Sequence, residues 1–277
     1  MNDVQRYGPW ALVTGASDGI GRALSQHLAA QGLNVVLVAR RRDALAALAA
    51  DLSAAHSVQT NVLAVDLADP AGVTVVEEQT RTMDIGIVVL AAGFGTTGTV
   101  LETSADEESA LVAVNVTAVM RLAHTFASRL VSRGTGALVL FGSIVGWQGV
   151  PGQANYAASK AYVQSLAEGL HGELRPFGVD VLAVAPGPVG SGFGPRAGLD
   201  LGSATSPDTV ARSTLAALGR RRTVVPGLQG TFLTAALRPL PRRLRSAILS
   251  RVIAGRRLRS SASRPAAEQT LGCRHGG

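Results

Sequence analysis

Short runs of valine, leucine and isoleucine alternate along this chain with longer segments whose apolar residues recur at helical spacing. Such alternation is typical of a parallel sheet whose strands are joined by crossover helices. Seven runs are expected to be strands: WALVTG, NVVLVAR, VQTNVLAVDL, IGIVVLAAG, GALVLFGS, VDVLAVAPG and RTVVPG. The helices expected between them include residues 21–31, 42–54, 107–133 and 154–175. We therefore predict an α/β fold with a doubly wound parallel sheet in three layers, which binds ligands beyond the carboxyl ends of its strands.

Length and composition favour one large domain with two short C-terminal additions. The chain has 277 residues, of which 47% are hydrophobic and 16% charged, and this suffices for a substantial core. We assign residues 1–225 to the α/β unit, 226–254 to a basic helical extension and 255–277 to a tail expected to be disordered. The single cysteine, Cys273, allows no internal disulfide and no metal-binding cluster, so no metal site is predicted.

The search for membrane and export signals leads to the expectation of a cytoplasmic protein. No window contains about 18 uninterrupted apolar residues, the length that a transmembrane helix needs. The first residues, MNDVQRYGPW, lack the charged and apolar regions of a signal peptide.

The formal net charge of +7 is unevenly distributed. Up to Gly219 the chain has 13 basic and 18 acidic residues, whereas from Arg220 onward it has 13 arginines and one glutamate. The acidic body argues against a nucleic-acid partner. In the basic segment, five apolar residues fall on one helical face: Leu244, Ile248, Leu249, Val252 and Ile253. Either this helix packs back on the domain, or it makes a peripheral contact with an anionic membrane or a partner.

A glycine-rich turn, TGASDGIG, follows the first predicted strand and precedes a helix. Its glycines, Gly15, Gly19 and Gly21, permit a tight turn, close approach to a pyrophosphate and close packing of the helix on the strand. Such a turn can also be a plain connector. Its place between a strand and a helix favours a dinucleotide site, as in Rossmann-type sheets of about seven strands.

The end of the second predicted strand indicates which dinucleotide binds. The position where NAD-dependent sites carry an acid is Ala39, and Arg40 follows it, which suits the 2′-phosphate of NADP. Arg41 and Arg42 fit the solvated start of a helix equally well. The third predicted strand ends in Asp66-Leu67, placed to flank an adenine. NADP(H) is therefore expected rather than NAD(H).

Four features together resemble the classical short-chain dehydrogenase/reductase family. They are the TGASDGIG turn, Asn115 on a long helix, Ser143 after a strand, and the Tyr156-x-x-x-Lys160 pair. The resemblance covers residues 8–225, and a serine 13 residues before the tyrosine makes the combination highly specific. It implies a catalytic tetrad formed by Asn115, Ser143, Tyr156 and Lys160.

The resemblance also implies a role for each member of this tetrad. Tyr156 would be the acid in carbonyl reduction, and Ser143 would polarise the carbonyl. Lys160, the only lysine in the chain, would contact the nicotinamide ribose, and Asn115 would hold a water in the proton path. Tyr156 and Lys160 share one helix face, being four residues apart. A free tyrosine has a pKa of about 10, and we expect the nearby ammonium to lower it.

The rest of the expected cofactor site is implied by the same resemblance. The stretch APGPVGSGF resembles the Pro-Gly loop of the family, with Val189 near the nicotinamide carboxamide and Ser191 in place of the usual threonine. The sequence departs from the family where Leu90-Ala91-Ala92-Gly93 replaces the usual Asn-Asn-Ala-Gly, so backbone groups of the central sheet need other partners. The expected cofactor contacts are Gly15, Ser17, Gly19, Ile20, Gly21, Arg40, Asp66, Leu67, Ala92, Gly93, Tyr156, Lys160, Pro186, Gly187, Val189 and Ser191.

These features predict an NADP(H)-dependent oxidoreductase. It would transfer a hydride between the nicotinamide and a carbonyl or secondary alcohol of a moderately apolar small molecule. The alternative is a non-catalytic NADP(H)-sensing or regulatory protein on the same fold. The glycine-rich segment 190–205 is expected to cover the site as a lid, and no charged group in it is assigned to the substrate. The resemblance further implies a homodimer or homotetramer.

Overall fold

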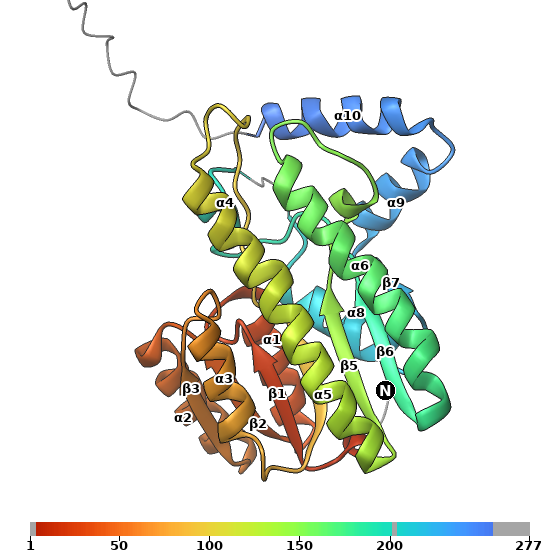
Figure 1. Cartoon of the computed structure of the whole chain (residues 1–277). Coiled ribbons are helices and arrows are strands. Elements are labelled where there is room, and N and C mark those ends of the chain that lie inside the picture. The colour runs from red at the N-terminus through yellow and green to blue at the C-terminus, as the bar shows by residue number, and fades with distance from the viewer. Residues whose placement is uncertain (1–3, 201–203, 257–277) are drawn as a thin grey trace, which may run out of the picture.

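The computed structural model describes residues 4–200 and 204–256. Within these residues a seven-stranded parallel sheet lies between two layers of helices (Figure 1). Its strand order is β3-β2-β1-β4-β5-β6-β7, so the chain winds outward from β1 first in one direction and then in the other. The predicted doubly wound α/β fold is therefore confirmed.

The strands are short and mostly buried. Their bounds are β1 (Trp10–Thr14), β2 (Asn34–Ala39), β3 (Thr60–Ala64), β4 (Ile85–Leu90), β5 (Gly136–Phe141), β6 (Val179–Val184) and β7 (Thr223–Val224). All seven lie within the runs predicted as strands. The runs extended further because their last residues form the loops after the strands, where Gly15, Arg40, Asp66 and Ser143 are found.

The helices of the α/β unit connect successive strands. They are α1 (Gly19–Ala30), α2 (Arg42–His56), α3 (Pro70–Gln79), α4 (Ala105–Val112), α5 (Val119–Arg133), α6 (Ala154–Leu174), α7 (Phe193–Arg196) and α8 (Pro207–Ala217). Short turns of 3-10 helix cover Val4–Tyr7, Ile144–Trp147 and Arg175–Phe177. The predicted helix 107–133 is interrupted by a π-helical turn, Ala113–Ala118, which separates α4 from α5.

Each face of the sheet has its own apolar core. Helices α1, α2 and α8 cover one face, where Val13 of β1 points. Helices α3, α5 and α6 cover the other face, where Leu12 points. This alternation of neighbouring residues between faces is the two-residue period of a strand. Because both faces are covered, the strands read as nearly continuous apolar runs.

The helical segment 105–133 is long and apolar enough, by length and composition, to cross a membrane. No such helix was predicted, because no window of the sequence contains about 18 uninterrupted apolar residues. The core helix of a globular domain passes the same test, and α5 buries Leu122, Phe126 and Leu130 in the core against the sheet. Packing within the domain thus explains the apolar character of this segment.

Two further helices, α9 (Leu228–Leu237) and α10 (Arg242–Ala254), occupy the basic segment near the C-terminus. Figure 1 shows α10 lying across the end of the molecule beyond the tips of the strands. Its Leu249 and Ile253 are buried, whereas Leu244 and Val252 are largely exposed. Together with Leu237 the two buried residues form a small core with Val150, Ala157, Ala197 and Leu199. Helix α10 therefore packs back on the domain. Most of the tail predicted for 255–277 lies outside the described residues.

Candidate active site

A cavity of about 900 Å³ lies beyond the carboxyl ends of the central strands. Its wall is built largely from the loops that follow these strands, including Gly15 after β1, Arg40 after β2, Gly93 after β4, Ser143 after β5 and Pro186 after β6. A parallel sheet brings these loops together because all its strands end at the same edge. Residues from α6, α7, α9 and α10 complete the wall.

The glycine-rich turn forms one end of this cavity. Asp18 caps helix α1 by accepting a hydrogen bond from the Gly19 amide at 2.7 Å. Gly15 has a φ of +71°, and a Cβ there would lie 3.0 Å from Cα of Ala92. At Gly21, a Cβ would overlap the carbonyl of Gly15. The turn thus brings the backbone at the N-terminus of α1 to the cavity wall, which fits the binding of a pyrophosphate.

Two arginines lie beside this turn, not one. The Arg40 guanidinium is 3.7 Å from the Asp66 carboxylate. The neighbouring Arg41 turns back toward the glycine-rich loop and donates to the carbonyl of Ser17 at 3.1 Å and to its hydroxyl at 3.3 Å. Both arginines line the cavity, whereas Arg42 does not. Sequence reasoning gave most weight to Arg40 and left Arg41 as a possible solvated helix start, so Arg41 was not among the expected cofactor contacts.

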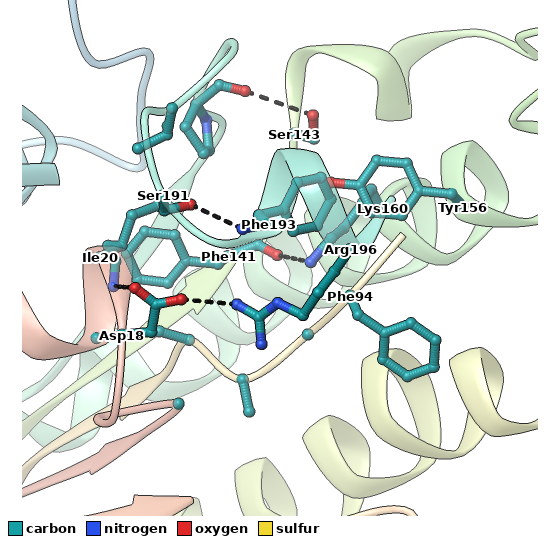
Figure 2. A pocket seen from close by; sticks show the side chains of 18 of the residues that line it. Asp18, Ile20, Phe94, Phe141, Ser143, Tyr156, Lys160, Ser191, Phe193 and Arg196 are labelled. Atoms are coloured by element: carbon teal, nitrogen blue, oxygen red, sulfur yellow. Dashed lines mark hydrogen bonds and ion pairs between the residues drawn. The ribbon is translucent and has the colours of Figure 1, made fainter. Parts of the chain in front are cut away.

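Helix α6 and strand β5 bring three of the predicted catalytic residues together. Tyr156 and Lys160 lie on the buried face of α6, and the Lys160 ammonium is 5.8 Å from the centre of the Tyr156 ring. Lys160 donates a hydrogen bond to the carbonyl of Phe141 at 3.0 Å (Figure 2). Ser143 follows β5, where its hydroxyl lies 3.4 Å from the carbonyl of Pro186. All three residues line the cavity.

Burial controls the protonation of this group. It raises the pKa of the Tyr156 phenol well above its ordinary value, against the opposing effect of a hydrogen bond with Ser143. It also lowers the pKa of Lys160 to about 8. The expectation that Lys160 lowers the pKa of Tyr156 is therefore wrong for this arrangement. The desolvation of the phenolate is the largest effect, and the ammonium is directed at the carbonyl of Phe141.

Asn115 lies behind the cavity wall rather than on it. It is fully buried in the π-helical turn, where its side-chain oxygen accepts from the Phe94 amide at 3.1 Å. Its amide nitrogen donates to the Phe94 carbonyl at 2.9 Å and to the Ser159 hydroxyl at 3.2 Å. This side chain is thus engaged with the loop after β4, so its geometry fits the positioning of Phe94 better than the holding of a water.

The loop after β4 also explains how the sheet tolerates Leu90 and Ala91. The Thr14 hydroxyl accepts a hydrogen bond from the Ala92 amide at 3.0 Å and lies 3.4 Å from the carbonyl of Val89. Leu90 is buried in the apolar core. A threonine at the end of β1 thus supplies the backbone partner in this chain.

The segment predicted to be a lid, 190–205, contributes Ser191, Phe193, Arg196 and Leu199 to the cavity wall in its described part. Its helix α7 places the Phe193 ring against Tyr156, with ring centres 5.6 Å apart. Arg196 forms an ion pair with Asp18 of the glycine-rich turn at 2.9 Å (Figure 2). It also donates to the carbonyl of Gly192 at 2.7 Å. The lid therefore contacts both the catalytic group and the turn, through two residues that sequence reasoning did not assign.

The far end of the cavity is apolar. Its wall there includes Leu199, Leu233, Leu249, Val252 and Ile253, together with Arg256. The residues from α9 and α10 reach the cavity only because these helices fold back over the strand ends. The apolar face of the C-terminal helix offered packing on the domain as one interpretation, but no local pattern signals that its residues line the cavity. The sixteen residues expected to contact a cofactor, in contrast, all line this cavity.

Comparisons with known proteins identify the family of this chain. Residues 9–198 match the family model of the short chain dehydrogenases. A very-long-chain 3-oxoacyl-CoA reductase of Meyerozyma guilliermondii is 34% identical over 225 residues, which cover 77% of this chain and 66% of that protein. A 7beta-hydroxysteroid dehydrogenase of Collinsella aerofaciens is 30% identical over 187 residues, which cover 68% of this chain and 71% of that protein. The chain thus spans about two thirds of the length of these relatives.

Solved structures are similar over nearly their whole length. A 7beta-hydroxysteroid dehydrogenase superimposes with a TM-score of 0.82 at 25% identity, covering 90% of this chain and 99% of that one. A short-chain dehydrogenase from Sphingobium yanoikuyae, determined in complex with NADPH, has a TM-score of 0.76 at 34% identity. The match covers 93% of this chain and 99% of that structure.

Proposed function

Because the chain belongs to the short-chain dehydrogenase family, we propose that it transfers a hydride between NADP(H) and a carbonyl or secondary alcohol of a moderately apolar small molecule. The convergence of Ser143, Tyr156 and Lys160 on the same cavity as the glycine-rich turn carries this proposal. A bound dinucleotide and a ketone can thus meet in one enclosed space.

The chain's own residues supply the acid and the binding groups. Tyr156 is protonated at neutral pH, because burial raises the pKa of its phenol, and it donates this proton to the carbonyl oxygen. The hydroxyl of Ser143 donates to the same oxygen as negative charge develops on it. Lys160, with a pKa of about 8, holds or releases a proton beside the tyrosine near neutral pH. The nicotinamide, when bound, supplies the hydride.

The activity is tested by following NADPH oxidation with a panel of ketones of increasing apolar surface. Replacing Tyr156 with phenylalanine should lower kcat by roughly 10²- to 10⁴-fold, the usual contribution of a positioned acid. Tyr162→Phe is the matched control, since Tyr162 lies on the same helix, is exposed and does not line the cavity. Binding of NADPH without turnover of any ketone would instead support a sensing or regulatory protein.

The preference for NADP(H) is proposed on the cluster formed by Ser17, Arg40 and Arg41. A 2′-phosphate bound there gains charge-assisted hydrogen bonds, so NADPH should bind more tightly than NADH by about 1.5–3 kcal/mol. Arg40→Gln and Arg41→Gln should each reduce this difference, whereas Arg42→Gln should not. The measurement is a fluorescence titration of both cofactors at one ionic strength. Equal affinities in the wild type would contradict the proposal.

We also propose that the protein acts in the cytoplasm as a homodimer or homotetramer, as its family resemblance implies. Light scattering after size exclusion tests the assembly, and cell fractionation tests the location. A peripheral membrane contact through α10 has no support from its packing, because Leu249 and Ile253 face the domain. Flotation with anionic and neutral liposomes decides that question.

A further inference from the structure

The cavity wall contains more positive than negative side chains. The acids on it are Asp18 and Asp66, and both lie at the end formed by the glycine-rich turn and β3. The positively charged side chains on it are Arg40, Arg41, Lys160, Arg196 and Arg256. An excess of cations on an enclosed wall favours an anionic ligand.

Four of these five cations contact partners in the protein. Arg40 pairs with Asp66, and Arg196 pairs with Asp18. Arg41 donates to Ser17, and Lys160 donates to the carbonyl of Phe141. Within the described residues, the side chain of Arg256 has neither an ion pair nor a hydrogen bond.

The backbone of Arg256 is nevertheless held in place. Its amide donates to the carbonyl of Ile253 at 3.0 Å, and its own carbonyl accepts from the Asp200 amide at 2.8 Å. Arg256 therefore joins the end of α10 to the segment that follows α7. Its side chain is half-buried at the cavity wall. An arginine fixed in this way can offer its guanidinium to a ligand with little loss of backbone freedom.

The cavity wall that carries this arginine and the catalytic group also carries a group of apolar side chains. Phe193 packs on Tyr156, and the side chains beyond it are Leu199, Leu233, Leu249, Val252 and Ile253. From Thr209 to Arg256 the sequence has ten arginines and no acid, so no carboxylate of this segment competes for the site. The wall of one cavity thus carries the proton donor Tyr156, a group of apolar side chains and the cation Arg256.

We propose that the substrate is an amphipathic carbonyl compound whose apolar body carries a terminal anionic group, a carboxylate or a phosphate, and that Arg256 binds this group. The inference rests on the proposed carbonyl reduction at Tyr156. It adds Arg256 as a specificity-determining residue on the wall of the same cavity. The guanidinium matches both anions because its paired N–H groups bind two oxygens at once.

The test uses a series of straight-chain oxo-carboxylates in which the ketone moves stepwise away from the carboxylate. Each is compared with its uncharged methyl ester and with the matched oxo-alkyl phosphate, and kcat and KM are measured with saturating NADPH. At the best chain length, at least one anionic ketone should have a KM about tenfold or more below that of the ester. The carboxylate and phosphate arms show which anion the site prefers.

Arg256→Gln should remove this preference and leave the KM for the ester unchanged, and Arg256→Lys should retain part of it. Arg251→Gln is the matched control, because Arg251 is an exposed arginine of the same helix that does not line the cavity. Calorimetric binding of the same ketones to the NADP⁺ complex, which has no hydride to transfer, measures the preference without turnover. Thermal melting confirms that each variant is folded.

Equal KM values for charged and uncharged ketones in the wild type would overturn the inference, and so would a preference that survives in Arg256→Gln. In both cases the proposed reduction stands, because the esters are still reduced. If no ketone is reduced, the proposed function fails. The calorimetric preference and its dependence on Arg256 then decide separately whether the anion site exists.

Discussion

The lone lysine, Lys160, is buried at the cavity wall with close neighbours. Its ammonium donates to the carbonyl of Phe141, and a Cβ added at Gly93 would already lie 3.3 Å from it. An ammonium is compact and its donors rotate, whereas a guanidinium is a longer, planar fork with fixed donor directions. The shape of the site therefore explains why a chain that otherwise uses only arginine as its strongly basic residue retains a lysine here.

We predict that Lys160→Arg folds and keeps its positive charge but loses turnover. The guanidinium should displace the groups around Tyr156, so kcat should fall by roughly 10²-fold or more, within the range of acid–base positioning. The measurement is kcat at saturating NADPH, after thermal melting has shown a native-like fold. A kcat within about threefold of the wild type would mean that lysine is not required.

A second residue-level prediction concerns the stability cost of Lys160. Burial lowers its pKa from 10.5 in the unfolded chain to about 8 in the folded one, so the unfolded state binds more protons between these values. Stability should therefore rise as the pH increases through this interval. Below it, the buried ammonium costs the fold up to about 3 kcal/mol.

Lys160→Met removes this cost and should be more stable than the wild type near neutral pH. The difference should shrink as the pH rises from about 8 toward 10.5, the interval between the two pKa values. Denaturant unfolding of both proteins across this range measures the difference. A gap that does not change with pH would show that Lys160 does not titrate as its burial predicts.

At the scale of an element, helix α7, which belongs to the predicted lid, contacts the glycine-rich turn. Arg196 reaches Asp18, while Phe193 of the same helix packs on Tyr156. The side chains of this ion pair are 52% and 34% exposed, so its contribution is that of a surface pair, about 1 kcal/mol or less. This ion pair by itself therefore holds the α7 segment to the turn only weakly.

We predict that Arg196→Gln raises the Kd for NADPH by about two- to fivefold, mainly through faster release. Asp18→Asn should have a similar effect on the lid and still cap α1, because asparagine is also a good capping residue. The double variant should bind NADPH no more weakly than either single variant. Fully additive effects in stopped-flow release experiments would show that the two residues act independently.

For the whole molecule, the fold-back of α9 and α10 adds an apolar part to the cavity wall. Leu249 and Ile253 are buried in a small core that is separate from the two cores of the sheet. Disturbing this small core should therefore release α10 without unfolding the α/β unit. The cofactor end of the cavity, built from the strand loops, should remain intact.

We predict that Leu249→Asp raises the KM for an apolar ketone by about tenfold or more, since an apolar surface the size of a leucine side chain stabilises a bound ligand by about 1.5 kcal/mol or more. The Kd for NADPH should stay within about twofold of the wild type. Leu244→Asp is the control, because Leu244 lies on the same helix with 47% of its surface exposed. A parallel weakening of NADPH binding would show that α10 supports the whole domain.

Local spacing in the sequence determined the fold and the chemical centre of the site. A strand, a glycine turn and a helix in succession can be read from neighbouring residues, and seven such runs leave few topologies open. The pair Tyr156 and Lys160 shares a helix face by its spacing alone. Ser143 joins them because the loops of a parallel sheet gather at one edge.

Only the tertiary structure decided how these residues behave. The shift in the pKa of Tyr156 depends on burial by segments far away in the sequence, and so its direction could not be read from the nearby lysine. The same holds for Arg41, which turns toward Ser17, and for Asn115, which holds Phe94. Arg256 reaches the cavity because α10 folds back over the end of the molecule beyond the strand tips. Secondary structure follows from residues a few positions apart, whereas burial, charge pairing and the shape of the cavity follow from contacts between distant segments.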